Sequence, residues 1–154
     1  MPLSPCLAPS RRDAGFTLVE LIAVVTIIGT LASLAVPAGR EAVDRARVAR
    51  AIGDIKVLST NLDSQDSLPD QLAFFGPVQL DPWGNPYQYN KFPPDRRVPR
   101  GARRDRFLVP LNTTYDLYSM GRDGDTTPPL TARNSLDDII RANDGGFIGL
   151  ASRY

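Results

Sequence analysis

The pattern of apolar and polar positions divides the chain into three parts. Residues 1–15 contain three prolines and have no helical period. The stretch from Gly15 to Ala38 is apolar except for one charged residue, Glu20. The remaining residues mix short apolar patterns with prolines, glycines and charges. The pattern predicts a membrane-spanning helix followed by one small domain.

The apolar stretch is long enough to cross a membrane. Residues 21–38 carry no charge. At about 1.5 Å per residue, this run and its flanks cover roughly 30 Å, the thickness of the hydrocarbon core of a bilayer. The run is longer than the apolar core of about 7–15 residues in a secretory signal, and it continues directly into a helical pattern. We therefore expect a single-pass anchor.

The helical pattern continues beyond the apolar stretch. Pro37 removes one backbone donor, so we expect it to kink the helix without ending it. The Leu68-Pro69 pair ends any helix before it. One helix is therefore predicted from Phe16 to about Leu62, with the apolar stripe of its second half facing a core. The stripe consists of Val43, Ala46, Ile52, Ile55, Leu58 and Leu62.

The second half of the chain predicts a small antiparallel sheet that packs on this helix. Its lone tryptophan, Trp83, is expected to cover a small core, and the tail from Asn143 to Tyr154 to fold back over that core. The predicted fold class is α+β. The expected elements are a helical turn at 70–75 and short strands at 87–90, 106–109 and 115–119.

Composition excludes several kinds of function. The chain has 18 Lys and Arg against 17 Asp and Glu, so it lacks the basic excess of a nucleic-acid binder, and no nucleic acid is expected as a partner. It has no histidine, and its one cysteine, Cys6, precedes the apolar stretch, which excludes a disulfide within the chain. Without these residues, and without a paired-acid motif, the sequence predicts that the chain is not an enzyme.

Glu20 requires a partner. An unpaired carboxylate in an apolar span costs on the order of a few kcal/mol. A cut between Gly15 and Phe16 would give Phe16 an α-amine with a pKa of about 8. Residues four apart share a helix face. Glu20 can therefore pair with the amine of its own chain or with that of a neighbouring chain.

The run Gly15-Phe16-Thr17-Leu18-Val19-Glu20 resembles the processing site of type IV pilins and type II secretion pseudopilins. The resemblance implies a type IV pilin-like fold and a leader, residues 1–15, that prepilin peptidase removes. It also implies N-methylation of Phe16 and contact between Phe16 and Glu20 of adjacent subunits. Residues 16–38 would form the transmembrane helix and then the filament core. Residues 39–154 would form a periplasmic domain on a bacterial inner-membrane protein.

Two later stretches, DPWGNPYQY at 81–89 and YDLYSMGRDG at 115–124, resemble the major pseudopilin of type II secretion, the G subunit. This family implies a homopolymer, a short periplasmic filament that drives protein export across the outer membrane. Its partners would be minor pseudopilins, the inner-membrane assembly platform and, before assembly, membrane lipid. The alternative is a type IV pilin of a surface fibre or DNA-uptake apparatus. Pilins of that class often contain a disulfide, which this chain without its leader cannot form.

An acidic, glycine-containing stretch follows. Clustered carboxylates suggest a hard cation such as calcium, but the spacing does not fit an EF-hand, and the residues alone favour a solvated acidic turn. The pseudopilin resemblance favours a structural Ca²⁺ instead. It implies as ligands the Met120 carbonyl and the carboxylates of Asp123, Asp137 and Asp138, with Asp125 as an extra candidate. The preceding stretch, residues 91–106, has six arginines and predicts a solvated loop or a partner-binding surface.

Overall fold

The computed structural model describes residues 15–95 and 97–154. The predicted leader, apart from its last residue Gly15, lies outside the described residues, as does Cys6. The chain divides into two compact units, with the boundary between Glu41 and Ala42. Each unit is therefore considered by itself.

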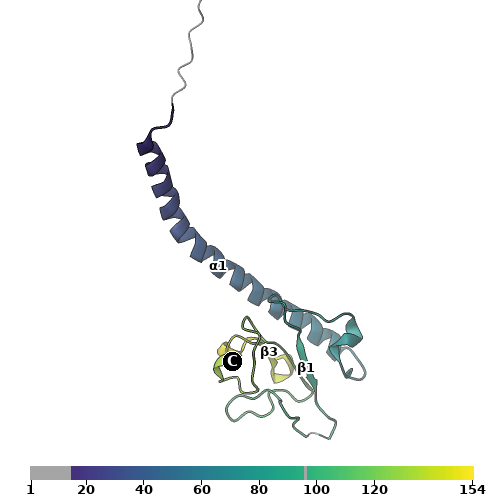
Figure 1. The fold of residues 1–154 in the computed structure, drawn as a ribbon. Coiled ribbons are helices and arrows are strands. Elements are labelled where there is room, and N and C mark those ends of the chain that lie inside the picture. The colour runs from purple at the N-terminus through teal and green to yellow at the C-terminus, as the bar shows by residue number, and fades with distance from the viewer. Residues whose placement is uncertain (1–14, 96) are drawn as a thin grey trace, which may run out of the picture. The chain divides into compact units, whose positions relative to one another are not determined.

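One long helix, α1 (Leu18–Asp63), confirms the helix predicted from Phe16 to about Leu62. It continues through Pro37, and its apolar first half passes in Figure 1 from purple to blue. Among the described residues, α1 is the one helix long and apolar enough to cross a membrane. None of the most apolar stretch of this helix is buried.

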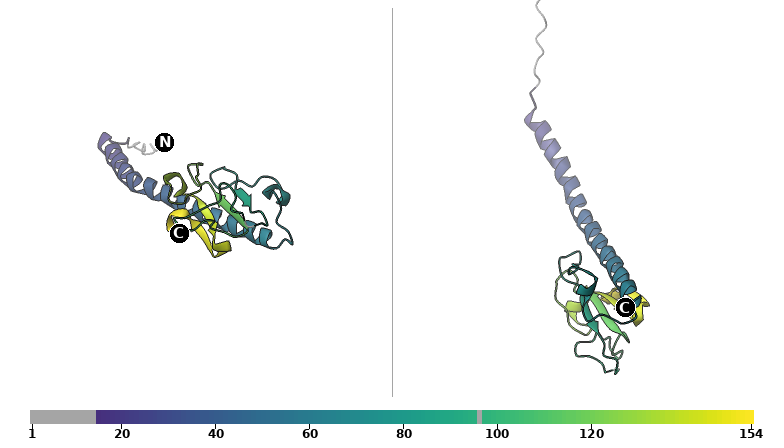
Figure 2. Two further views of the ribbon diagram at one scale, coloured as in Figure 1. Left: turned by 90° about the horizontal axis from the view of Figure 1, so that it is seen from below. Right: turned by 90° about the vertical axis from the view of Figure 1, so that its right-hand side faces the viewer.

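The second unit contains a four-stranded antiparallel sheet in the order β1-β2-β3-β4. Strand β1 lies below the last turns of α1 in Figure 1, at a steep angle to the helix, and Figure 2 shows the sheet from two further sides. The strands are β1 (Gln88–Lys91), β2 (Tyr115–Ser119), β3 (Ile139–Ala142) and β4 (Phe147–Leu150). Short 3₁₀ turns are η1 (Leu72–Phe75), η2 (Arg133–Ser135), η3 (Asn143–Gly145) and η4 (Ala151–Arg153).

Two of the three predicted strands are confirmed, as β1 and β2, and so is the helical turn at η1. The strand predicted at 106–109 is wrong. A tight loop stands there instead, closed by mutual backbone hydrogen bonds between Asp105 and Leu108. Its apolar residues have no face to bury against, and Phe107 is fully exposed. Strands β3 and β4 were not predicted from the sequence. Strand β4, in the tail, forms one of the two edges of the sheet.

The first core lies between α1 and the sheet. The helix contributes residues spaced by four, three and four, so they share one face. The fold class is thus α+β as predicted, with the second half of the long helix on a small antiparallel sheet. The buried members of this core are Ala51, Ile55, Leu58 and Leu62 from α1, with Tyr87, Tyr115, Leu117 and Ile139.

Part of the predicted helix stripe is wrong. Val43 and Ala46 are exposed, Ile52 is half-buried, and Ala51, which the stripe omitted, is fully buried. The buried stripe begins only at Ala51 because the core residues of the sheet pack on the C-terminal turns of α1. Trp83 is partly buried and packs against this core, which confirms its predicted place.

The other face of the sheet is covered by loops. Successive residues of a strand point to opposite faces, so Tyr118 and Ile140 point away from α1. They pack in a second cluster, which includes Leu111 before β2 and Leu130 before β3. Because both faces are covered, charged side chains in these loops can become buried.

Candidate functional site

The N-terminus of α1 carries a reciprocal capping arrangement. The Thr17 backbone N–H and the Thr17 hydroxyl both donate to Oε2 of Glu20, at 3.0 and 2.8 Å. The Glu20 N–H donates back to the Thr17 hydroxyl at 3.2 Å. This is a capping box, which satisfies donors that a helix start leaves unpaired. This capping box was not predicted, although its signal, Thr17 followed three residues later by Glu20, is present in the sequence.

This arrangement holds the one carboxylate of the apolar stretch at a fixed place. Gly15 and Phe16, the predicted cleavage site, directly precede the box, and Phe16 is 82% exposed. In the uncut chain, Thr17 is thus the partner of Glu20. The predicted pairing of Glu20 with a Phe16 amine requires the cut, so it stays a prediction.

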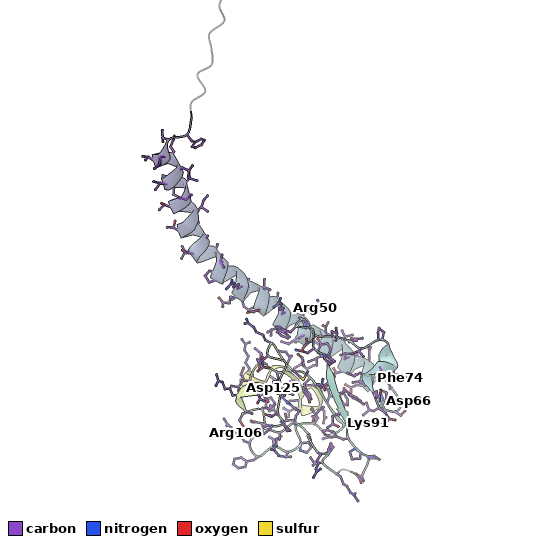
Figure 3. All side chains as sticks on the ribbon, viewed as in Figure 1. Arg50, Asp66, Phe74, Lys91, Arg106 and Asp125 are labelled. Carbon is purple, nitrogen blue, oxygen red and sulfur yellow. The ribbon has the colours of Figure 1, made fainter. Side chains whose placement is uncertain are left out.

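The apolar side chains that follow are uncovered. Figure 3 shows them projecting from all sides of the first half of α1. Their large members between residues 16 and 36 are 48–82% exposed. A surface of this extent is not stable in water and marks a membrane or protein interaction site.

The two pseudopilin-like stretches meet in space. The Ser119 hydroxyl donates to Oδ2 of Asp81 at 2.6 Å, and Nδ2 of Asn85 donates to the Gly121 carbonyl at 3.2 Å. Oδ1 of Asp81 also accepts the backbone N–H groups of Trp83 and Asn85. The turn at 81–86 thereby supports the start of the acidic loop, residues 120–138.

Within the acidic loop, Asp137 acts as an acceptor for the backbone. Its Oδ2 accepts the N–H of Arg122 at 2.8 Å and that of Asp123 at 3.2 Å. Oδ1 of Asp123 accepts the N–H of Asp125, as in an Asx turn. Figure 3 labels Asp125 on this loop. These carboxylates shape the loop by binding its own amides.

Asp138 lies directly before β3 and is fully buried. Its Oδ2 accepts the Thr126 hydroxyl at 2.5 Å and a guanidinium N–H of Arg103, with which it forms a salt bridge. Burial raises the pKa of Asp138 to about 6, against the lowering effects of Thr126 and Arg103. The neighbouring guanidinium, which stays protonated in proteins, favours the ionised form of this carboxylate.

Three of the predicted calcium ligands, Asp123, Asp137 and Asp138, accept hydrogen bonds from the protein itself. In the part of the chain that the structure describes, no three acidic, His or Cys side chains are placed to hold one ion. Asp137 and Asp138 are engaged by protein donors. Oδ1 of Asp138 is the exception, a buried oxygen with no hydrogen-bond partner among the described residues. The ion and its ligands, Met120, Asp123, Asp137 and Asp138, stay a prediction.

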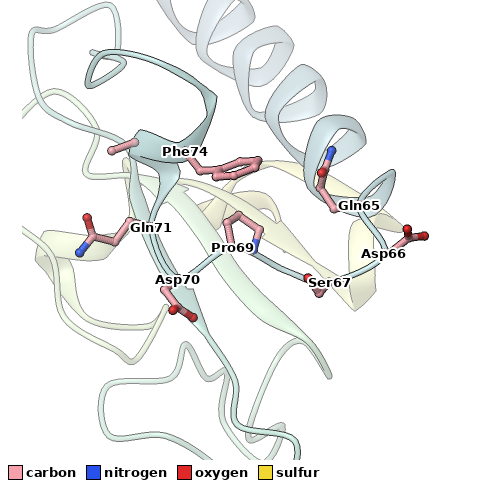
Figure 4. Close-up of a pocket in the computed structure, with 8 residues that line it drawn as sticks. Gln65, Asp66, Ser67, Pro69, Asp70, Gln71 and Phe74 are labelled. Atoms are coloured by element: carbon pink, nitrogen blue, oxygen red, sulfur yellow. The ribbon is translucent and has the colours of Figure 1, made fainter.

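The structure also has a shallow hollow of about 550 Å³ between the end of α1 and η1. Figure 4 shows Phe74 across it from Gln65, with Asp66 and Asp70 at its edge. Its other lining residues are Ser67, Pro69, Gln71 and Ala73.

Comparisons with known proteins point the same way as these motifs. Residues 10–36 match the family model described as the prokaryotic N-terminal methylation motif. The chain is 32% identical over 140 residues to the type II secretion system core protein G of Pseudomonas aeruginosa. This alignment covers 74% of the chain and 87% of the relative. The protein of the same name from Aeromonas hydrophila is 32% identical over 142 residues, 75% of this chain and 87% of the relative.

A fimbrial protein of Pseudomonas aeruginosa is 44% identical over only 54 residues, 35% of each chain. No solved structure matches the chain at a significant level. The methylation motif at the start of a long helix, with a small α+β domain after it, defines a protein of the type IV pilin-like class. Within this class, the chain belongs to the family of the type II secretion system core protein G, the major pseudopilins, because that similarity extends over most of both chains.

Proposed function

We propose that the chain is a structural subunit of a type II secretion pseudopilus, a periplasmic filament that drives export across the outer membrane. The observation that carries the proposal is the uncovered apolar half of α1, with Glu20 fixed at its start. Lipid covers this surface before assembly, and the same surfaces of other copies cover it in the filament. The proposal includes no catalytic step.

The processing steps follow from the same segment. Prepilin peptidase removes residues 1–15 and methylates the new Phe16 amine. The subunit then waits as a single-pass protein of the inner membrane, with the second unit in the periplasm. The assembly platform and minor pseudopilins are its partners there. The family match at residues 10–36 supports cleavage and methylation at this segment.

Glu20 neutralises a positive charge at the subunit contact. In the apolar filament core, a carboxylate without a partner is strongly unfavourable. The amine of a neighbouring Phe16 supplies the opposite charge. Thr17 then serves as the partner of Glu20 until that amine arrives, because its hydroxyl and its N–H hold the carboxylate.

The test replaces Glu20 with Ala in cells that contain the remaining secretion components. We expect normal cleavage and membrane insertion but a decrease in the number of filaments of roughly tenfold or more. The loss of about 1.4 kcal/mol at each subunit contact already weakens the association of subunits by about tenfold. Filaments are counted after cross-linking, and the mature N-terminus is read by mass spectrometry. Thr26→Val is the matched control, because its hydroxyl bonds only the Ile22 carbonyl of its own helix in the structure. Filaments of normal number and length with Glu20→Ala would exclude this role.

The alternative, a type IV pilin of a surface fibre or DNA-uptake apparatus, is less well supported. The similarity to fimbrial proteins covers 54 residues, about a third of the chain. The adjacent genes discriminate between the two. A secretin with secretion components favours the pseudopilus, and a retraction ATPase with adhesins favours the pilus.

A further inference from the structure

A buried arginine, Arg103, pairs with one of the four predicted calcium ligands, Asp138. Arg103 is only 2% exposed, although it comes from a stretch rich in arginine. Its Nη1 donates to the Thr126 hydroxyl at 2.5 Å and to the Thr127 carbonyl at 2.8 Å. Its Nη2 donates to Oδ2 of Asp138. The guanidinium also lies over the Tyr118 ring, 4.4 Å from the ring centre.

The three acceptors are of the kinds that calcium prefers. A carboxylate, a backbone carbonyl and a hydroxyl all present oxygen to one positive centre, as in a hard-cation site. Here the positive centre is a planar guanidinium, whose donors form a fixed fork and which stays protonated in proteins. The charge of Asp138 is therefore balanced by a side chain, at any concentration of free ions.

The backbone around this arginine is held in place from both sides. The Arg103 N–H donates to Oδ2 of Asp116 in β2 at 2.7 Å. The next residue, Arg104, donates its N–H to the Pro128 carbonyl at 3.1 Å and accepts the Leu130 N–H at 2.9 Å. Residues 103–104 thus run beside the acidic loop and place the guanidinium at its inner end, next to β3.

We propose that the Arg103 guanidinium is the internal cation of the acidic loop and holds it closed against β3 without a bound calcium ion. The inference goes beyond the filament function, since it concerns the folding of one subunit in any assembly state. It also replaces the calcium ion that the family resemblance implies. A pseudopilus built from such subunits keeps its subunits folded when calcium is withdrawn.

The first test measures the melting temperature of the full chain in detergent, in excess calcium chloride and in excess EGTA. An ion bound only by the folded state raises the melting temperature with its concentration. We expect the same melting temperature in both solutions. A melting temperature that rises in calcium would overturn the proposal.

The second test removes the cation. Arg103→Met leaves Asp138 buried with the Thr126 hydrogen bond but without a positively charged partner, so we expect the melting temperature to fall by roughly 10 °C or more. Arg104→Ala is the matched control, because Arg104 is exposed and contacts the acidic loop through hydrogen bonds of its backbone. The control should melt with the parent. Equal losses in Arg103→Met and Arg104→Ala would contradict the proposal.

The third test separates the charge pair from simple packing. The double variant Arg103→Met with Asp138→Asn removes both charges and keeps an oxygen for Thr126. We expect it to melt at a higher temperature than Arg103→Met alone, because no unpaired charge is buried. If Arg103→Met does not fold at all, a folded double variant supports the proposal and an unfolded one overturns it.

Discussion

Gly121 shows how single residues determine the shape of the acidic loop. Its φ is +67°, a left-handed conformation that side chains disfavour. A Cβ at this position would stand 2.5 Å from the Asp137 carbonyl oxygen and 2.6 Å from Oδ2 of Asp137. The absence of a side chain thus lets the turn after β2 contact the end of the same loop, and Asp137 can reach the amides of Arg122 and Asp123.

We expect Gly121→Ala to lower the free energy of unfolding by about 2 kcal/mol or more, because the left-handed backbone and the contact with Asp137 each oppose a methyl group. Urea unfolding followed by the fluorescence of Trp83 measures it. Gly53→Ala is the matched control, since Gly53 lies in α1 with open space around its Cβ position. The control should keep or raise stability by up to about 1 kcal/mol. Equal stability of the two variants would show that Gly121 has no such role.

The sequence could predict some single residues and not others. Glu20 was recognisable because a charge in an apolar run is conspicuous locally. Arg103 was not, because it is one of six arginines in a stretch that reads as a solvated loop. Its burial follows from contacts with Asp138, 35 residues later, and with the loop that covers the sheet. Such long-range contacts leave no local pattern.

At the scale of elements, the sequence predicted the helices and strands that have a regular spacing of apolar residues or a recognisable turn beside them. The helix α1 and strands β1 and β2 are confirmed for this reason. Strand β3 is four residues long and buried throughout, so it shows no alternation between polar and apolar positions. Strand β4 is equally short and contains Gly149. Strands β3 and β4 form because they pair with neighbouring strands, and these neighbours are present only in the complete sheet.

Two tyrosine hydroxyls join the second half of α1 to the sheet. The hydroxyl of Tyr87, just before β1, donates to Oδ2 of Asp54 at 3.0 Å, and that of Tyr115 in β2 donates to Oδ1 of Asp63 at 2.8 Å. Burial, and then the hydrogen bond to the aspartate, raises the pKa of each phenol well above its usual value of 10.0. The folded chain therefore keeps these phenols protonated at pH values where the unfolded chain loses the protons.

The sign of the resulting pH dependence is definite. Below about pH 10 the phenols are neutral in both states, and their contribution to stability is fully present. Above it, the unfolded chain binds fewer protons, so the free energy of unfolding falls by up to about 1.4 kcal/mol per pH unit for each phenol. Urea unfolding at a series of alkaline pH values should show this fall. It should be shallower in Tyr87→Phe than in Tyr154→Phe, whose phenol lies at an exposed position. The same slope in both variants would contradict the assignment to Tyr87.

At the scale of the whole molecule, the two units have opposite requirements. The second unit has its own buried cores. The first consists of helix with exposed apolar side chains, and the described residues contain nothing that covers them. The first unit therefore needs lipid or other subunits, whereas the second does not. In the proposed function, removal of the leader links these states, because it would create the Phe16 amine that Glu20 is proposed to bind.

The single cysteine makes this step directly measurable. Cys6 is the one thiol of the chain, and it precedes Gly15. Cleavage after Gly15 should therefore leave a mature subunit with no thiol at all. We expect a maleimide-polyethylene glycol reagent, added after denaturation, to label the uncut chain once and the membrane-inserted mature chain not at all. Gly15→Val, which removes the glycine before the cut, should stay long and labelled.

A thiol placed elsewhere checks that labelling itself works. Lys56→Cys adds a cysteine at an exposed position of α1 in the second unit, so this variant should be labelled both before and after cleavage. A mature-length chain of the parent sequence that still takes up the label would show that the cut lies before Cys6. In that event Phe16 would carry no free amine, and the pairing proposed for Glu20 would lose its partner.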